Sequence, residues 1–476
     1  MTPLWTSADA AQATGGKTSC IWQASGVSID TRSLQKGDLF VALSDTRDGH
    51  DFVAQALEKG AAAALVSHVP DGVAKDAPLL LVDDVLAALG DLARAARTRT
   101  QARIVAVTGS VGKTSTKEML RTVLARQGRT HAAAGSYNNH WGVPLTLARM
   151  PANSQFAVIE IGMNHPGEIA PLAQMTRPHV ALITNVAAVH MAAFDDIMGI
   201  AHEKAALFSG LESQGTAVIN ADQATADILF NTAKDAEAKI VSFGADHNAD
   251  FHIENLKLTQ TNTIIHANSP NGPLLLKLAI PGRHFALNAL ATLAAAQALG
   301  ADLTVAALDL ASWSPPKGRG AREMITLDLV DDHLSLTLLD DAFNASPISM
   351  AAALDVLAAS QPTPPGRRIA ILGDMLELGP DEATFHAAIA SLPATENIDT
   401  IHCVGPRMMA LYGALDPSQK GDWVEKAPEM AARVHGLVQA GDVILIKGSK
   451  GSKVSLVVDA IRKLGHPQTQ KTQGIQ

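Results

Sequence analysis

The sequence predicts an α/β protein of three domains, in which strands and helices alternate. Its 476 residues exceed what one hydrophobic core usually holds, since about 150 residues per domain is typical. Short apolar runs recur along the chain, each followed by a turn and a helical pattern, as in parallel sheets flanked by helices. One of these units contains a glycine-bearing loop of the phosphate-binding kind.

Composition and charge exclude several classes of protein. Hydrophobic residues make up 47% of the chain and charged residues 18%, which is typical of a folded protein and not of an extended disordered one. The formal net charge is −9 and there is no long basic run, so a nucleic-acid partner is not expected.

The cysteines and the apolar segments bear on location. Only Cys20 and Cys403 are present, without metal-ligand spacing, which fits a reducing compartment. The N-terminus lacks the features of a secretory signal, and neither 178–194 nor 285–300 has the composition of a membrane span. We therefore expect a cytoplasmic protein with no integral membrane segment.

The first predicted domain, residues 1–92, combines short strands, turns and a helix. It contains the segments VSIDTRSLQKGDLFVAL and DGHDFVAQALEKGAAAALV, and the apolar run 79–82 closes it. A helix rich in alanine and arginine, residues 86–97, then leads to the next strand and suggests the boundary.

The segment RIVAVTGSVGKTSTKEMLRTVLARQ, residues 103–127, predicts a strand, a P-loop and a helix. In such a loop the backbone N–H groups point at phosphate oxygens, Lys113 would reach the β- and γ-phosphates, and the hydroxyl of Thr114 would bind Mg²⁺. The predicted ATP-binding loop comprises Thr108, Gly109, Ser110, Val111, Gly112, Lys113, Thr114 and Ser115.

This loop departs from the usual G-x-x-x-x-G-K-[ST] spacing. Val107 stands where the first glycine belongs, and the first glycine here is Gly109. A Gly-Lys-Thr tripeptide also occurs in ordinary surface loops. The apolar strand 104–107 before it and the amphipathic helix after it, which Gly128 ends, favour nucleotide binding.

The second predicted domain, residues 93–314, has strands at 156–161, 180–184 and 217–220 and helices around 198–209 and 284–299. This alternation predicts a parallel sheet. Period-two stretches within 249–281 predict an antiparallel excursion at one edge. The segment SWSPPKGRGAR, residues 312–322, is the best second linker.

The third predicted domain, residues 315–462, repeats one pattern. The segments LSLTLLDD, RRIAILGDM, IDTIHCVG and DVILIKGS are apolar strands, each followed by a turn and a helix. This predicts a doubly wound, Rossmann-like fold. The polar tail, residues 463–476, is expected to be disordered.

Three side chains of the second domain are candidates for chemistry, because open α/β sheets bind ligands at the carboxyl ends of their strands. Glu160 ends a strand and its carboxylate suits Mg²⁺, although it could be a cap or ion-pair residue. His190 follows the next strand, and a lone histidine is more often structural. Lys204 lies in an amphipathic helix, where a solvated surface lysine is the ordinary interpretation.

Polar residues in loops form a second group of candidates. Asn138 and Asn139 either make turns or hydrogen-bond a polar ligand. Asp341 or Asp340 could bind a ribose hydroxyl or cap the following helix. The last strand ends in the same manner with Lys447, Gly448 and Ser449.

Taken in order along the chain, these stretches resemble the Mur ligases, the ATP-dependent amide ligases of cell-wall precursor synthesis. The resemblance spans residues 27–457. It is carried by IDTRSLQKGDLFVAL and DGHDF in the first domain, by TGSVGKTSTKEML and NNHWGVPLTL in the second, and by DDAFNASPISMAAALDVL and ILGDMLELG in the third. Within the family, the motifs are most similar to those of members that add D-alanyl-D-alanine.

The resemblance implies an activity. An ADP-forming ligase would join D-alanyl-D-alanine to UDP-N-acetylmuramoyl-tripeptide through an acyl phosphate, producing the pentapeptide precursor of peptidoglycan. The first domain would bind the UDP substrate, the central domain ATP and two Mg²⁺ ions, and the third would close over the second about the linker 312–322. A monomer is expected.

The resemblance also implies roles for individual residues. The catalytic residues would be Lys113, Glu160, His190 and Lys204, and the Mg²⁺ ligands Thr114, Glu160, His190 and a carbamylated Lys204. Asn288 would contact adenine, Arg319 the γ-phosphate and Asp341 the ribose. The substrate-binding residues would be Asp30, Thr31, Arg32, Ser33, Asn138, Asn139, Asn344, Lys447 and Ser449. The chain departs from the family pattern at Phe285, Ser346 and Ala206.

Other functions stay open at this point. A sibling ligase that adds the third amino acid would carry an Asp-Asn-Pro-Arg type motif, which is missing here, and folylpolyglutamate-type ligases lack a first domain like 27–82. A P-loop switch protein that hydrolyses ATP slowly is a rival from another class, but it would not need a separate substrate domain.

Overall fold

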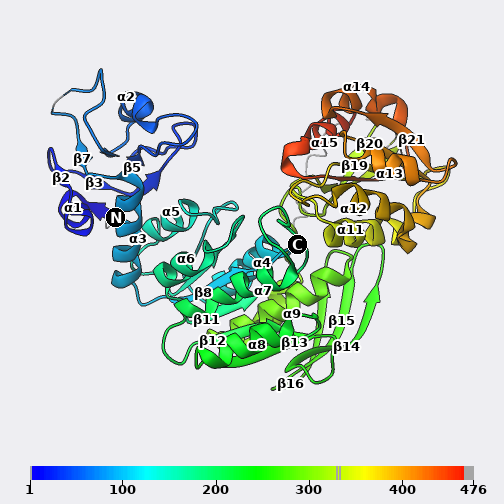
Figure 1. Cartoon of the computed structure of the whole chain (residues 1–476), viewed down its shortest axis with the longest axis horizontal. Helices are drawn as coiled ribbons and strands as arrows, with labels where there is room; N and C mark the ends of the chain where they lie inside the picture. Colours follow the sequence, from blue (N-terminus) through cyan, green and yellow to red (C-terminus); the bar gives the residue numbers. More distant parts are fainter. Residues whose placement is uncertain (1–2, 75, 329–330, 332–333, 466–476) are drawn as a thin grey trace, which may run out of the picture.

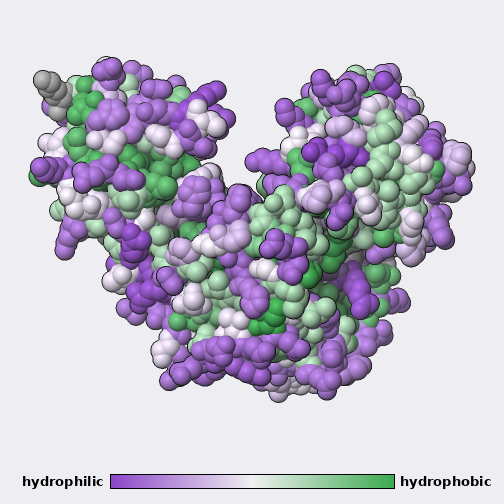
Figure 2. Space-filling model, viewed as in Figure 1, coloured by the Kyte–Doolittle hydropathy of each residue, from purple (hydrophilic) through white to green (hydrophobic). Residues whose placement is uncertain are grey.

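The computed structural model describes residues 3–74, 76–328, 331 and 334–465, and these form three lobes (Figure 1). The first and third lobes rise from opposite ends of the central one, with a wide gap between them in the space-filling view (Figure 2). The predicted disordered tail falls largely on 466–476, outside the described residues. None of the helices in the described ranges has the length and apolar character that crossing a bilayer needs.

The first lobe is built on a five-stranded sheet. Its strands are, in spatial order, β2 (Lys17–Thr18), β7 (Leu79–Leu81), β6 (Ala63–Val66), β5 (Asp38–Val41) and β4 (Gly26–Ser28). All neighbours are parallel except β2 and β7. Two short strands, β1 (Trp5–Thr6) and β3 (Gln23–Ala24), pair separately, and the helices are α1 (Ser7–Thr14) and α2 (Val53–Glu58).

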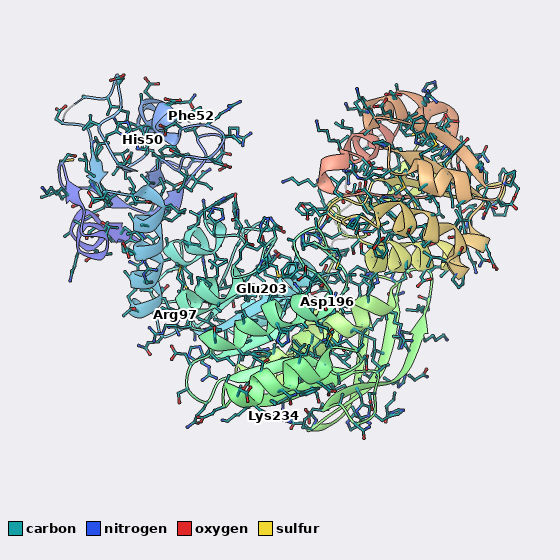
Figure 3. The ribbon with its side chains drawn as sticks, viewed as in Figure 1. His50, Phe52, Arg97, Asp196, Glu203 and Lys234 are labelled. Atoms are coloured by element: carbon teal, nitrogen blue, oxygen red, sulfur yellow. The ribbon has the colours of Figure 1, made fainter. Side chains whose placement is uncertain are left out.

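The helix α3 (Val85–Arg99) joins the first lobe to the central one. Asp84 caps its start by accepting from the backbone N–H of Ala87. Near its other end the guanidinium of Arg97, buried and labelled in Figure 3, donates to the backbone carbonyls of Thr176 and Arg177. The proposed boundary between residues 92 and 93 therefore falls inside one continuous helix.

The central lobe contains a nine-stranded sheet. In spatial order its strands are β16 (Gly272–Leu278), β15 (Thr263–Ser269), β14 (Phe251–Leu258), β13 (Lys239–Gly244), β12 (Thr216–Asn220), β11 (Val180–Ile183), β8 (Arg103–Thr108), β10 (Phe156–Glu160) and β9 (Thr130–Ala132). The pairings from β9 to β14 are parallel, and β14, β15 and β16 are antiparallel at one edge, which confirms the predicted excursion.

Both faces of this sheet are covered by helices. Along β8, Val105 and Val107 pack in a core with α4 (Lys113–Ala125), α9 (Arg283–Ala298) and α10 (Leu303–Leu310). Ile104 and Ala106 point to the other face. That face is covered by α5 (Gly142–Ala148), α6 (Ile169–Thr176), α7 (Ile197–Ala205) and α8 (Ala226–Asp235). A strand buried on both sides explains the continuous apolar run of the sequence.

The third lobe is a six-stranded sheet with helices on both faces. The strand order is β17 (Ala321–Thr326), β18 (Ser335–Asp341), β22 (Val443–Lys447), β19 (Arg368–Gly373), β20 (Thr400–Val404) and β21 (Lys420–Val424). All pairs are parallel except β17 with β18, which confirms the doubly wound prediction. The helices are α11 (Pro347–Ala359), α12 (Glu382–Ala388), α13 (Met409–Ala414), α14 (Ala427–Leu437) and α15 (Ser455–Arg462).

Candidate active site

A cavity of about 980 Å³ lies between the central and third lobes. The P-loop and the loops that follow β10 and β11 line it from the central lobe, and residues that follow β18, β19 and β22 line it from the third. The predicted site residues that line it are Ser110, Val111, Gly112, Lys113, Thr114, Ser115, Asn138, Asn139, Glu160, His190, Asn288, Arg319, Asp341, Asn344 and Lys447.

The P-loop has the geometry that its glycines allow. Gly109 and Gly112 have φ angles of 147° and 86°, which residues other than glycine rarely adopt. A Cβ atom on Gly109 would lie 1.9 Å from the hydroxyl of Thr184, and one on Gly112 would lie 2.7 Å from the amide oxygen of Asn288. Val107 is tolerated in place of the usual glycine because it is still part of β8 and fully buried.

Lys113 is the cation of this loop. Its Nζ donates to the backbone carbonyls of Gly109 and Ser110, at 2.6 and 3.3 Å. Burial lowers the pKa of Lys113 to about 8, and the carboxylate of Glu160 opposes this shift. A phosphate entering the loop would compete with the two carbonyls for the ammonium group.

The side chains of Thr114 and Glu160 contact each other next to the P-loop. The hydroxyl of Thr114 lies 3.1 Å from Oε1 of Glu160 and 3.0 Å from the hydroxyl of Ser136. Asn138 donates to the same Oε1 at 2.7 Å. The second oxygen of Glu160, Oε2, is buried and lacks a hydrogen-bond partner among the described residues. A buried, unpartnered carboxylate oxygen beside a threonine hydroxyl is a donor set that fits Mg²⁺.

Lys204 is buried, which rules out the surface lysine that its amphipathic helix suggested. Asp196 caps the start of its helix α7 by accepting from the N–H of Gly199, and Glu203 near the end of α7 accepts from the N–H groups of Gly167 and Ile169. Asp196 and Glu203 are labelled in Figure 3. Burial, with the nearby ammonium of Lys113, holds the pKa of Lys204 well below its usual range. A neutral amine is the form that adds CO₂.

His190 contacts the third lobe. Its Nδ1 lies 2.5 Å from Oε2 of Glu377, which follows β19. Within the described ranges no three histidine, cysteine, aspartate or glutamate side chains gather into a metal site, so His190 and Glu160 line one cavity without forming such a cluster. Sequence reasoning missed Glu377, although the quoted motif ILGDMLELG contains it.

Arg319 reaches the P-loop from the linker. It stands between Gly318 and Gly320, whose φ angles are 75° and 87°, and its guanidinium lies 4.1 Å from the centre of the Phe343 ring. One terminal nitrogen is 3.4 Å from the hydroxyl of Thr114. The side chain therefore spans from the third lobe to the P-loop.

Asp341 pairs with Lys447 across the ends of β18 and β22, at 2.7 Å. Burial raises the pKa of Asp341, and Lys447 counteracts this rise. Asp341 does not cap α11, because Ser346 forms a capping box with Ser349 there. The capping alternative for Asp341 is therefore wrong.

Several predicted residues lie elsewhere. Ser449 is buried and bonds to the carbonyl of Ala345 and the N–H of Leu376, so its hydroxyl ties loops together and does not line the cavity. The four first-lobe residues also lie outside the cavity lining. Among them Asp30 and Arg32 form a surface ion pair at 2.6 Å. The remaining residues outside the cavity lining are Thr31, Ser33, Thr108, Gly109 and Lys204.

Comparison with known proteins shows which family the chain resembles. Three family models match the chain: "Mur ligase family, catalytic domain" at residues 23–97, "Mur ligase middle domain" at 107–296 and "Mur ligase, glutamate ligase domain" at 327–450. Two UDP-N-acetylmuramoyl-tripeptide--D-alanyl-D-alanine ligases are similar over most of their length. That of Escherichia coli K12 is 38% identical, covering 92% of this chain and 94% of the relative, and that of Bacillus subtilis is 35% identical, covering 91% and 92%.

Solved structures agree. A crystal structure of MurF from Acinetobacter baumannii superposes with a TM-score of 0.82 at 29% identity, covering 96% of this chain and 98% of that one. The MurF ligase from Thermotoga maritima in complex with ADP has a TM-score of 0.76 at 24% identity, covering 92% and 97%, and supports the fold.

Proposed function

The chain belongs to the Mur ligase family, and from this premise we infer that it is an ATP-dependent ligase that joins D-alanyl-D-alanine to UDP-N-acetylmuramoyl-tripeptide. The products are the pentapeptide precursor of peptidoglycan, ADP and phosphate. One observation carries this conclusion: the cavity lies between the P-loop and the third lobe. Within it Arg319 comes within 3.4 Å of Thr114 and so joins the two.

The first step of the reaction must overcome a charge repulsion. The terminal carboxylate of the tripeptide attacks the γ-phosphorus of ATP, so an anion approaches a polyanion. The ammonium of Lys113, the guanidinium of Arg319 and the N–H groups at the start of α4 supply the opposing charge. In the second step the amine of D-alanyl-D-alanine attacks the acyl phosphate and phosphate leaves.

Mg²⁺ would be held by Thr114 and Glu160, with His190 and Lys204 as further ligands. When bound, such ions neutralise phosphate charge and align the transferred group. The unpartnered Oε2 of Glu160 supports its part in this set. Lys204 could take part only as a carbamate, in which its amine nitrogen has bonded to CO₂ and released one proton, because an ammonium cannot ligate a cation.

The nucleotide contacts follow from the same cavity. We place adenine near Asn288, which lies against Gly112, and the ribose near Asp341 and Lys447. His284 lines this region, and burial lowers its pKa to about 4, so it stays neutral during catalysis. Asn138, Asn139 and Asn344 would face the peptide substrates.

The UDP end of the substrate would bind the first lobe. Asp30, Thr31, Arg32 and Ser33 lie between β4 and β5, away from the cavity, so the substrate would extend from one lobe to the other.

We place the domains at 1–92, 93–314 and 315–462, with the third closing on the second about the linker. Unchanged small-angle scattering on addition of ATP and both substrates would contradict such a closure.

We propose that the enzyme acts as a monomer in the cytoplasm. Cys20 and Cys403 are both free thiols, one exposed and one buried, as a reducing compartment allows. Light scattering on a sizing column measures the mass directly. A dimer at micromolar concentration would contradict the first part of this proposal.

Phosphate release tests the function. The wild-type protein is given ATP, Mg²⁺ and UDP-N-acetylmuramoyl-tripeptide, with and without D-alanyl-D-alanine, and the nucleotide product is identified by mass spectrometry. Release that depends on the dipeptide, with a pentapeptide product, is expected. Release that another amino acid drives would indicate a sibling ligase, and release without any acceptor would indicate an ATP-hydrolysing switch.

A further inference from the structure

Lys117 is a fully buried lysine that takes no part in the reaction described above. It lies on α4 three residues after Thr114, so both side chains leave neighbouring positions on one helix. Its side chain is 0% exposed, and it does not line the cavity. A buried ammonium is costly unless each of its N–H groups finds an acceptor.

Its three N–H groups have three acceptors. Nζ donates to the backbone carbonyls of Ala133 and Gly135, at 2.8 and 3.1 Å, and lies 2.7 Å from Oε1 of Glu118. Ala133 and Gly135 belong to the loop that runs from the end of β9 to the start of α5. Two of the three contacts of Lys117 therefore hold this loop against α4.

The same loop supplies the contacts behind the P-loop. Ser136, which follows Gly135 directly, has its hydroxyl 3.0 Å from that of Thr114. Asn138 donates to Glu160 at 2.7 Å, and its carbonyl accepts from the N–H of Gly162 at 2.7 Å. The residues that touch Thr114 and Glu160 thus follow immediately on the residues that Lys117 holds.

We infer that Lys117 is a positioning residue, which fastens the loop of residues 133–139 so that Ser136 and Asn138 meet Thr114 and Glu160. This inference rests on the proposed function, in which Asn138 and Asn139 face the nucleotide-peptide substrate. In the proposed function the ATP phosphates would bind the backbone N–H groups of the P-loop, whereas the loop of residues 133–139 contacts the side chains of Thr114 and Glu160. Loss of Lys117 therefore affects the peptide substrate and its carboxylate more than it affects ATP.

The test compares Lys117→Met with Glu118→Gln. Methionine is unbranched and only one heavy atom shorter than lysine, but it has no donor. Glutamine at 118 removes the charge opposite Lys117 and leaves both bonds to the loop. If holding the loop matters, only the first variant changes the kinetics. Since Glu118 also pairs with Arg121, melting temperatures are measured for both variants.

We expect Lys117→Met to raise the KM for UDP-N-acetylmuramoyl-tripeptide and lower kcat, each by about tenfold, while the Kd for ATP stays within about twofold. Backbone amides of residues 133–139 should exchange hydrogen about tenfold faster. Glu118→Gln should match the wild type in all four measurements.

Two results would overturn the inference. One is a folded Lys117→Met protein with unchanged loop exchange and unchanged KM. The other is a Kd for ATP that rises as much as the KM, since Lys117 would then only support the P-loop helix. If Lys117→Met does not fold, Lys117→Gln, whose shorter, uncharged side chain removes the ammonium group from the two loop carbonyls, is measured against the same criteria. Failure of the wild type to form pentapeptide would contradict the proposed function, whereas loop exchange without substrates still tests Lys117.

Discussion

The carboxylate of Glu377 contacts the imidazole of His190 across two lobes, with 2.5 Å between Oε2 and Nδ1. Both residues have positive φ angles, 66° and 56°, which residues other than glycine rarely adopt. Gly379 lies beside them, and a Cβ atom there would be 3.4 Å from the carbonyl of Met191. The loops after β11 and β19 therefore pack together at the cavity. In each loop the contacting residue, His190 or Glu377, has a strained backbone conformation.

This contact should matter for catalysis. In Glu377→Ala, His190 loses the partner that orients its ring, and we expect kcat to fall about tenfold with the KM for ATP within about twofold. Glu377→Gln keeps an oxygen that accepts from Nδ1–H, so its loss should be about threefold at most. Steady-state kinetics of the two variants decide the matter. Equal activities in wild type and Glu377→Ala would show that the contact has no catalytic role.

Arg319 and Phe343 give a second prediction. Arg319→Lys keeps the charge but loses the planar group that spans from the Phe343 ring to Thr114, and kcat should fall about a hundredfold. Phe343→Leu removes only the ring beneath the guanidinium, worth about 0.5–1 kcal/mol, so kcat should fall about two- to fivefold. If Phe343→Leu were the more damaging change, the ring would have a role other than supporting Arg319.

Lys204 should carry CO₂. Its burial and low pKa favour the neutral amine that forms a carbamate. In bicarbonate labelled with carbon-13, the wild-type protein should give a carbamate signal by nuclear magnetic resonance, and Lys204→Arg should not. A spectrum of the wild type without this signal, at a pH where the enzyme is active, would argue that Lys204 acts uncarbamylated.

His284 should make the protein sensitive to acid. Burial lowers its pKa from 6.5 to about 4, so between these values the unfolded chain binds more protons than the folded one. The stability contributed by neutral His284 is complete above pH 6.5 and is lost as the pH falls towards about 4. Glutamine cannot take up this proton.

The variant His284→Gln should therefore show a melting temperature that depends less on pH than that of the wild type over this interval. Thermal unfolding of both proteins at several pH values measures the difference. Parallel curves would mean that His284 titrates alike in the folded and unfolded states.

The sequence predicted those features whose cause is local. The strand β8, the P-loop and α4 follow one another within one unit, and Gly109 and Gly112 have the positive φ angles that such a loop needs. The buried strands of the third lobe were equally readable. The strands β17 and β21 were not predicted, because β17 follows directly on the Pro/Gly-rich linker and KGDWV has no continuous apolar run.

Contacts between lobes could not be derived from the residues alone. Nothing in the sequence near His190 points to Glu377, which is 187 residues away. The burial of Lys204 depends on packing around α7, so helical periodicity suggested a surface residue, and only the family resemblance pointed to a functional one. Lys117 drew no attention either, because its acceptors are backbone carbonyls, which no side-chain pattern reveals.

The central claim is that ATP activates the tripeptide carboxylate before the dipeptide attacks it. Tripeptide labelled with oxygen-18 in that carboxylate tests this most directly, by mass analysis of the phosphate released in a complete reaction. The account predicts that each phosphate gains one labelled oxygen and that the pentapeptide retains the other in its new amide. The account is contradicted if pentapeptide forms while the released phosphate is unlabelled, or if phosphate is released while the labelled tripeptide is recovered unchanged.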